Sequence, residues 1–329
     1  MKKTQPIIKW AGGKRKLAPL ISEIVKEEIP SHTHYVEPFF GGGSVYFDLY
    51  NNNLIKSSSI NDLVPQLVNF YRTISFQQNI EDIHESIDNK LKYFNSLDTD
   101  SKRRKYFSYL KKSFNKLWSN ENRNTSKHRK EPDFLNKSES KKSTVLLYVL
   151  NRTCFNGLFR VNRKGEFNVT IGSYEKVAIP NLVNMKASSK ALSKAEIFYG
   201  DYEVLLRKTN LKKNSFVYLD PPYVPNSKTS DFTSYSKERF KKNEDKDFEH
   251  KRLAENFTKL VDNGTKVILS NHNNERAWSM FVEGKKNIFV YGINITKTIG
   301  RVKGSKNTEG ELLISSFEIP FLKDKRIKL

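Results

Sequence analysis

The sequence contains a single cysteine, Cys154, among its 329 residues. One cysteine excludes an internal disulfide bond and is typical of a protein from a reducing compartment. No residue pattern that activates a thiol surrounds Cys154, so we interpret it as a small buried apolar side chain and not as a nucleophile. The location that we expect from this composition is the cytoplasm.

The chain also lacks an apolar run long enough to cross a membrane. No stretch of 18 apolar residues occurs, and no basic helical segment carries a strong apolar face. Residues 1–8 include lysines but no long apolar segment after them, which argues against a signal peptide. We therefore expect no membrane partner, and we predict no metal site.

Acidic residues are scarce relative to basic ones. The sequence has 58 Lys and Arg against 36 Asp and Glu, which gives a formal net charge of +22. Such a balance is typical of proteins that bind a polyanion, and nucleic acid is the first polyanion to consider. The length suits one large α/β domain with an insertion, or two modest domains.

The most informative stretch is Asp220-Pro221-Pro222-Tyr223, which ends the apolar run 215–219. The run predicts a buried strand, so the tetrapeptide lies at a strand's carboxyl end, where open α/β sheets bind ligands. Two successive prolines hold the carboxylate beside an aromatic ring. This pairing suits a planar heterocycle with an exocyclic amine, because the acid and a proline carbonyl accept its N–H bonds while the ring stacks. The alternative is an ordinary strand-to-loop turn.

A glycine-rich stretch, Glu37 to Gly43, follows a predicted strand and precedes a predicted helix. A strand, a glycine turn and a helix in this order bind the nucleotide end of a cofactor. Asp62 follows Gly41 by 21 residues, at the end of a second apolar run, where dinucleotide folds grip a ribose hydroxyl. The glycine spacing is not the phosphate-binding one, which disfavours NAD. S-adenosyl-L-methionine, with an adenosine and no phosphate, satisfies both features.

The middle of the chain changes character. Apolar residues recur at helical spacing over residues 66–150, and residues 101–142 contain 14 Lys or Arg against 4 Asp or Glu. A basic run of this kind is either a solvated helix face or a nucleic-acid contact. Residues 135–143 are rich in Ser and Lys and predict a mobile linker. Residues 226–247 are polar and predict a mobile loop.

A β-hairpin is predicted over residues 151–169, with its turn at Lys164-Gly165. Its leading edge offers an aromatic ring, an amide and an arginine, the side chains that base-reading loops use. The other regular elements that we predict are a helix over 17–25, strands over 196–198, 267–270 and 312–315, and a helix over 248–263.

Three stretches together carry a resemblance: Lys9 to Arg15 with two glycines, Glu37 to Gly43, and Asp220 to Tyr223. With these motifs in this order the chain resembles the Dam-type DNA adenine-N6 methyltransferases, of the family's alpha group, over nearly its whole length. The resemblance implies an α/β fold with a Rossmann-like seven-stranded sheet that contains one antiparallel strand. It also implies an inserted, mainly helical DNA-recognition domain that carries a β-hairpin. We expect a catalytic domain formed by residues 1–65 and 186–329, and a recognition domain formed by residues 66–185.

The resemblance further implies roles for single residues. Asp220, Pro221, Pro222 and Tyr223 would form the catalytic loop for a flipped adenine. The cofactor S-adenosyl-L-methionine would be bound by Trp10, Lys14, Glu37, Phe39, Gly41, Asp62, Asp201 and Asp220. Double-stranded DNA would be contacted by Lys9, Phe155, Asn156, Leu158 and Arg160.

The expected target is GATC or a similar short site, and the chain could belong to a restriction-modification system with a separate endonuclease. Where many family members carry Pro and Arg, this chain has Thr170 and Ser173, which leaves the recognition sequence open. A cytosine-N4 methyltransferase is an alternative, although those proteins more often carry Ser in place of Asp220. A cytosine-C5 enzyme would need a Pro-Cys nucleophile, and Cys154 follows Thr153. A non-catalytic DNA-binding protein with this fold is the alternative of another class.

Overall fold

The computed structural model describes all residues except 1–2, 31–32, 119–134, 163, 210, 212–214, 226–246, 295–309 and 328–329. The predicted loop over residues 226–247 therefore lies almost wholly outside the described residues. The chain divides into two compact units. The first unit comprises Met1–Lys14, Gly41–Asn52 and Asn61–Asp201, and the second comprises Arg15–Phe40, Asn53–Ile60 and Tyr202–Leu329.

Eight strands among the described residues form one sheet in the order β3-β2-β1-β4-β5-β7-β6-β8. β1 pairs in parallel with β2 and β4, and β4 pairs in parallel with β5. β7 is antiparallel to β5 and β6, and β8 is antiparallel to β6. The strands are β1 (His34–Glu37), β2 (Ser58–Asp62), β3 (Ala195–Tyr199), β4 (Ser215–Leu219), β5 (Lys266–His272), β6 (Phe289–Asn294), β7 (Gly310–Ser315) and β8 (Arg326–Ile327).

This sheet confirms the predicted α/β, Rossmann-like class but corrects the strand count. The first seven strands and the antiparallel β7 match the prediction, whereas β8 adds an eighth strand and a second antiparallel one. β8 has only two residues, which pair with Val290 and Tyr291 of β6. A run this short carries no alternation that a sequence pattern can detect.

The sheet is buried on both faces at its central strand, β4. All five of its residues are buried, and Tyr35 of β1 lies opposite Phe216 in the parallel register. A parallel strand covered on both faces reads as a continuous apolar run and not as an alternating one. The buried run therefore places the Asp220 loop at the carboxyl end of a central strand, as predicted.

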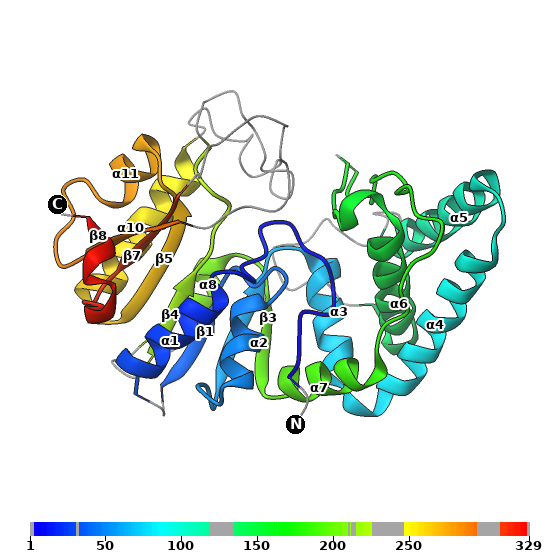
Figure 1. The fold of residues 1–329 in the computed structure, drawn as a ribbon, viewed down its shortest axis with the longest axis horizontal. Helices are drawn as coiled ribbons and strands as arrows, with labels where there is room; N and C mark the ends of the chain where they lie inside the picture. Colours follow the sequence, from blue (N-terminus) through cyan, green and yellow to red (C-terminus); the bar gives the residue numbers. More distant parts are fainter. Residues whose placement is uncertain are drawn as a thin grey trace. The chain divides into compact units, whose positions relative to one another are not determined.

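The helices are divided between the two units. In the second unit the helices are α1 (Ala18–Glu28), α8 (Tyr202–Lys208), α10 (Phe248–Asp262), α11 (Glu275–Phe281) and the 3-10 helix η4 (Pro320–Lys325). In the first unit they are α2 (Ser44–Asn51), α3 (Pro65–Ser75), η1 (Gln77–Asn79), α4 (Ile80–Ser96), α5 (Asp100–Trp118), α6 (Lys137–Thr153), η3 (Phe155–Gly157) and α7 (Leu182–Leu192). α4 and α5 both pack against α6 (Figure 1).

The predicted linker over residues 135–143 is wrong, because α6 begins at Lys137. Asn136 caps this helix: its side chain accepts a hydrogen bond from the Glu139 N–H at 3.0 Å. The Glu139 carboxylate in turn accepts from the Asn136 N–H at 3.2 Å, which completes a capping box. The Ser and Lys residues that suggest a linker form the first turns of this helix, which change from exposed at Lys137 and Ser138 to buried at Ser143.

The hairpin predicted over residues 151–169 is only partly confirmed, because residues 151–153 end α6, residues 155–157 form η3, and the described residues of 158–169 form a tight reversal. The Asn162 N–H donates to the Glu166 carbonyl at 2.8 Å, and the Gly165 N–H donates to the Asn162 carbonyl at 3.0 Å. Isolated antiparallel bridges join Val161 to Phe167 and Cys154 to Ile171. Cys154 is fully buried, and burial raises the pKa of its thiol to about 12, which confirms its interpretation as an apolar side chain.

Candidate active site

The glycine turn of the first unit is built around Gly41. Gly41 has a φ of 50°, and an added Cβ would lie 3.1 Å from Cδ1 of Trp10. Its N–H donates to Oδ2 of Asp62 at 2.9 Å, and its carbonyl accepts from the Tyr71 hydroxyl at 2.8 Å. The turn thus brings the predicted cofactor residues Trp10, Gly41 and Asp62 together, and only glycine fits without strain.

Asp62 lies at the end of β2 and is half-buried. Its Oδ1 accepts from the Val64 N–H at 2.9 Å. Burial raises the pKa of the Asp62 carboxyl to about 6, although the Val64, Gly41 and Leu63 N–H groups oppose the shift. Gly200, just after β3, donates its N–H to the Asp62 carbonyl at 3.1 Å. Asp201 therefore follows β3 beside the end of β2, as the sequence predicts.

Lys14 and Trp10 also take defined positions in the first unit. Lys14 Nζ donates to the Gly12 carbonyl at 3.1 Å. The Trp10 ring stacks on Phe159, with centroids 5.4 Å apart and planes inclined by 22°. Because Phe159 is buried in the hairpin segment, this stack links the amino-terminal glycine stretch to the predicted recognition residues.

In the second unit three carboxylates lie near Tyr218, from the end of β1, the residue after β4 and the start of β7. Glu37 accepts from the Tyr35 hydroxyl at 2.9 Å, and Asp220 accepts from the Ser270 hydroxyl at 3.1 Å. Glu311, at the start of β7, accepts from the Tyr223 hydroxyl. Burial raises the pKa of Tyr218 well above its usual value, and Asp220, Glu311 and Glu37 add to the shift by their charge. Such a gathering of negative charge favours a cationic group bound nearby.

The loop after Asp220 is held by β5. The Val224 N–H donates to Oδ1 of Asn271 at 3.1 Å, and Asn274 Nδ2 donates to the Val224 carbonyl at 3.0 Å. The Tyr223 ring meets His272 edge to face, with centroids 4.6 Å apart. Pro221 is buried as well, so the loop is held both before and after Tyr223, the predicted stacking residue.

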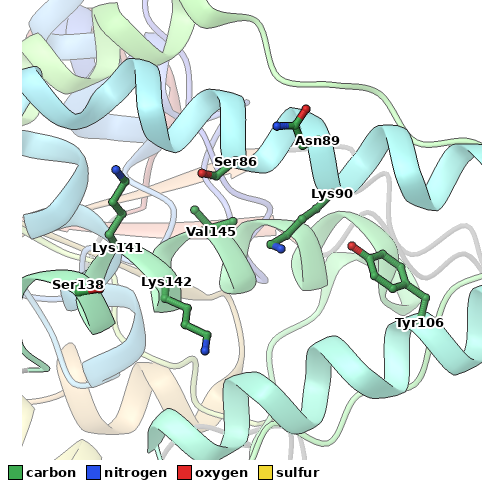
Figure 2. Close-up of a pocket in the computed structure, with 8 residues that line it drawn as sticks. All are labelled: Ser86, Asn89, Lys90, Tyr106, Ser138, Lys141, Lys142 and Val145. Carbon is green, nitrogen blue, oxygen red and sulfur yellow. The ribbon is translucent and has the colours of Figure 1, made fainter.

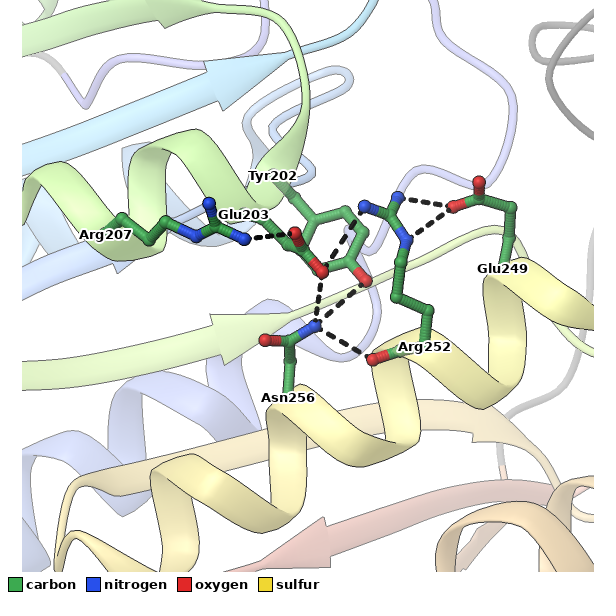
Figure 3. A network of polar contacts seen from close by, with 6 residues as sticks. All are labelled: Tyr202, Glu203, Arg207, Glu249, Arg252 and Asn256. Carbon is green, nitrogen blue, oxygen red and sulfur yellow. Dashed lines mark hydrogen bonds and ion pairs between the residues drawn. The ribbon is translucent and has the colours of Figure 1, made fainter.

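A polar network joins α8 and α10 and includes Tyr202, the residue against which Phe39 packs (Figure 3 shows the network). The Phe39 and Tyr202 rings have centroids 5.2 Å apart. The Arg252 guanidinium lies 4.8 Å from the centre of the Tyr202 ring and forms ion pairs with Glu203 and Glu249. The network therefore holds Tyr202 in place, and Tyr202 in turn packs against Phe39.

The predicted DNA residues lie on one segment and point outward. Phe155 is 52% exposed and Leu158 is 37% exposed, although both are large apolar side chains. Asn156 has a φ of 53° and is exposed. Exposed Arg160 donates from Nε to Oδ1 of Asn168 at 2.8 Å. An apolar pair exposed beside an amide and a guanidinium is a surface built for contact.

Lys9 is tied to this segment by Asn151, a residue that sequence patterns do not identify. The buried Asn151 side chain accepts from the Lys9 N–H at 2.9 Å. It also donates to the carbonyls of Lys9 at 2.9 Å and Gly157 at 2.8 Å. The exposed Lys9 side chain extends to 5.7 Å from the centre of the Tyr174 ring. One amide thus sets the spacing between Lys9 and the hairpin.

We expect Asn151→Ala to lower the free energy of unfolding by about 2–4 kcal/mol, because it leaves part-buried backbone groups of Lys9 and the buried carbonyl of Gly157 unpaired. Chemical denaturation of the two proteins measures this difference. Asn89→Ala, which removes an exposed amide from α4, is the control and should leave stability unchanged. An equal loss in both variants would contradict the role of Asn151.

Two further residues of the site escape sequence patterns. Ser270 bridges Tyr218 and Asp220, because its Oγ lies 3.1 Å from each side-chain oxygen. Glu311 is the second residue of β7, which begins at Gly310, whereas the prediction began the strand at Leu312. An acid directly before a buried apolar run was the available signal for Glu311.

Comparison with known proteins supports one family. The D12 class N6 adenine-specific DNA methyltransferase family matches residues 10–293. The Type II methyltransferase M.MjaIII of Methanocaldococcus jannaschii is 34% identical over 321 residues, covering 95% of this chain and 99% of the relative. The Type II methyltransferase M1.LlaDCHI of Lactococcus lactis subsp. cremoris is 30% identical over 95% of both chains. A DNA adenine methylase of Vibrio cholerae is 28% identical over 95% of this chain and 96% of its own.

Across the part of the chain that the structure describes, no helix combines the length and the apolar character needed to span a membrane.

Proposed function

The chain belongs to the D12 class N6 adenine-specific DNA methyltransferase family and is a DNA adenine methyltransferase. From this premise we propose that it transfers the methyl group of S-adenosyl-L-methionine to N6 of an adenine flipped out of a short duplex site. The observation that supports the chemistry best is Asp220, held by Ser270 at the carboxyl end of a central strand and followed by a constrained tyrosine.

The residues present fit the proposed cofactor. In the first unit, a side chain at position 41 would crowd Trp10, and the half-buried Asp62 carboxylate suits a ribose hydroxyl. In the second unit, the carboxylates of Glu37, Asp220 and Glu311 favour a cationic ligand. We propose that Trp10, Lys14, Glu37, Phe39, Gly41, Asp62, Asp201 and Asp220 bind S-adenosyl-L-methionine, which when bound supplies an electrophilic methyl group on a sulfonium.

The protein's own contribution is to position the target amine. The adenine amine is unreachable inside the base stack, so the base must be flipped. Asp220 and the Pro221 carbonyl accept the two N–H bonds of the amine, which directs the nitrogen lone pair away from them. Tyr223 stacks on the ring and Pro222 keeps the loop stiff. Orientation of bound reactants of this kind accounts for about 7–11 kcal/mol of a barrier.

We propose GATC, or a site with similar steps, as the target, with the recognition domain at residues 66–185 and the catalytic domain at 1–65 and 186–329. Lys9, Phe155, Asn156, Leu158 and Arg160 are the residue types expected for insertion and base reading, and the structure exposes them. An arginine that binds guanine in bidentate fashion is worth about 1–3 kcal/mol of discrimination.

Relatives named Type II methyltransferases lead us to propose a restriction-modification setting with a separate endonuclease. The family does not favour the alternatives of a cytosine-N4 enzyme or a non-catalytic binding protein. Incubation of unmethylated DNA with the protein and S-adenosyl-L-methionine, followed by digestion to nucleosides, tests the proposal. We expect N6-methyladenine among the nucleosides, and N4-methylcytosine or no modified nucleoside would refute the proposal.

Asp62 gives the cofactor proposal a dependence on pH. A ribose hydroxyl donates best to the ionised carboxylate, so affinity for S-adenosyl-L-methionine should rise as pH rises through about 6, the raised pKa of Asp62. Below that pH the affinity should fall by up to about tenfold per pH unit. Calorimetric titrations between pH 5 and pH 8, roughly the range that brackets this pKa, measure the effect.

The stability of the fold should depend on Asp62 in the opposite direction. The folded pKa of about 6 lies above the ordinary value of 3.8, so the folded protein binds this proton more tightly than the unfolded chain. The resulting stabilisation is complete below the ordinary value and is lost as pH rises through about 6. Asp62→Asn should remove both dependences. An affinity that stays level with pH in the parent protein would contradict the ribose role.

A further inference from the structure

A hollow of about 540 Å³ lies where α4, α5 and α6 of the first unit meet. Figure 2 shows its lining side chains, which come from all three helices. Every lining residue is neutral or basic, and none carries a carboxylate. The lining includes three lysines, Lys90, Lys141 and Lys142. Since no carboxylate lines the hollow beside them, the space has a positive potential that favours an anionic ligand.

Two of the three lysines of the hollow form no ion pair with any acid that the structure describes. Lys141 is paired with Asp82, with Nζ and Oδ2 2.7 Å apart. Among the described residues, Lys90 of α4 and Lys142 of α6 form no ion pair, and both side chains extend toward the space between the helices (Figure 2). Two ammonium groups directed into one hollow repel each other, and an anion bound between them would offset this repulsion.

Neutral hydrogen-bond donors complete the lining. The Tyr106 hydroxyl faces the same space in Figure 2, and burial raises the pKa of Tyr106 to about 12, so the phenol keeps its proton at neutral pH. The hydroxyls of Ser86 and Ser138 lie on the walls. Ammonium and hydroxyl donors around one space are the groups that bind phosphate oxygens.

We propose that this hollow is a phosphate-binding site, with Lys90 and Lys142 as its charged ligands. The inference rests on the proposed action on DNA only for the identity of the phosphate. The phosphate is either a phosphodiester of the DNA backbone flanking the target or the phosphate group of a small free compound. In the first case the helices would extend the protein's contact with DNA beyond the bases that it reads.

The test uses Lys90→Gln/Lys142→Gln in the full chain. The matched control is Lys323→Gln/Lys325→Gln, which removes two exposed charges from η4 of the second unit. Thermal unfolding of both variants should equal that of the parent. Equilibrium binding is measured as a function of salt, on a duplex that carries only the target and on one with long flanks. Each phosphate contact contributes about −0.9 to the slope of log K against log salt.

For a backbone phosphate we expect the slope to weaken by about 1–2 on the long duplex only, with the control variant close to the parent. For a small free compound we expect the DNA slopes to stay unchanged while binding of inorganic pyrophosphate, measured by calorimetry, is lost in the Lys90→Gln/Lys142→Gln variant alone. If the variant matches the parent in both measurements, the site does not exist. Failure of the parent to methylate adenine would refute the proposed function without affecting the pyrophosphate measurement.

Discussion

Asp220→Ala is expected to reduce methyl transfer by at least about 10³-fold, the loss seen when a group that acts directly on the reacting atoms is removed. The physical reason is position. Asp220 follows the buried strand β4, is fixed on one side by the Ser270 hydroxyl at 3.1 Å, and is followed by two prolines. Alanine removes the acceptor that orients the amine.

Single-turnover methylation of a target duplex, with saturating S-adenosyl-L-methionine, measures this loss. Asp262→Ala, which removes an exposed carboxylate from α10, is the matched control and should be fully active. Ser270→Ala should fall between the two, because it frees Asp220 without removing it. A rate for Asp220→Ala within tenfold of the parent, together with unchanged thermal unfolding, would exclude the proposed role.

The parts of the fold that follow from sequence are those in which burial makes a long, simple pattern. The run 215–219 is buried at every position, so its apolar residues are contiguous and the strand is evident. No sequence pattern predicted β6, because its apolar run is interrupted by Gly292 and the strand ends in exposed Asn294. The missed start of α6 has another cause, because Asn136 and Glu139 form a capping box within a stretch whose composition resembles a linker.

The parts of the site that follow from sequence are the residues whose neighbours in the chain carry the chemistry. Asp220 is recognisable because two prolines and a tyrosine follow it. Asn151 is not, because its partners are Lys9, at a distance of 142 residues, and the carbonyl of Gly157. Hydrogen bonds from a side chain to a distant backbone depend on the tertiary fold, and no local spacing predicts them.

Tyr223→Ala is expected to reduce methyl transfer by about 10²-fold or more, because stacking on an unpaired base is worth about 1–3 kcal/mol and orientation of the amine is lost with it. The structure shows a second residue that fixes the position of this ring: Glu311, which is only 5% exposed, accepts a hydrogen bond from the Tyr223 hydroxyl. Since Glu311 lies on β7 and Tyr223 follows β4, this hydrogen bond fixes the ring from across the sheet.

If Glu311 acts by holding the ring, Tyr223→Phe and Glu311→Ala should each slow transfer by about 10–150-fold, the equivalent of about 1.5–3 kcal/mol for one hydrogen bond to a charged group. The double variant should be no slower than the slower single one, because both substitutions remove the same contact. A fluorescent adenine analogue at the target position reports base flipping, and its signal should weaken in all three variants. Additive losses, or a full fluorescence signal with slow transfer, would show that Glu311 does not act through Tyr223.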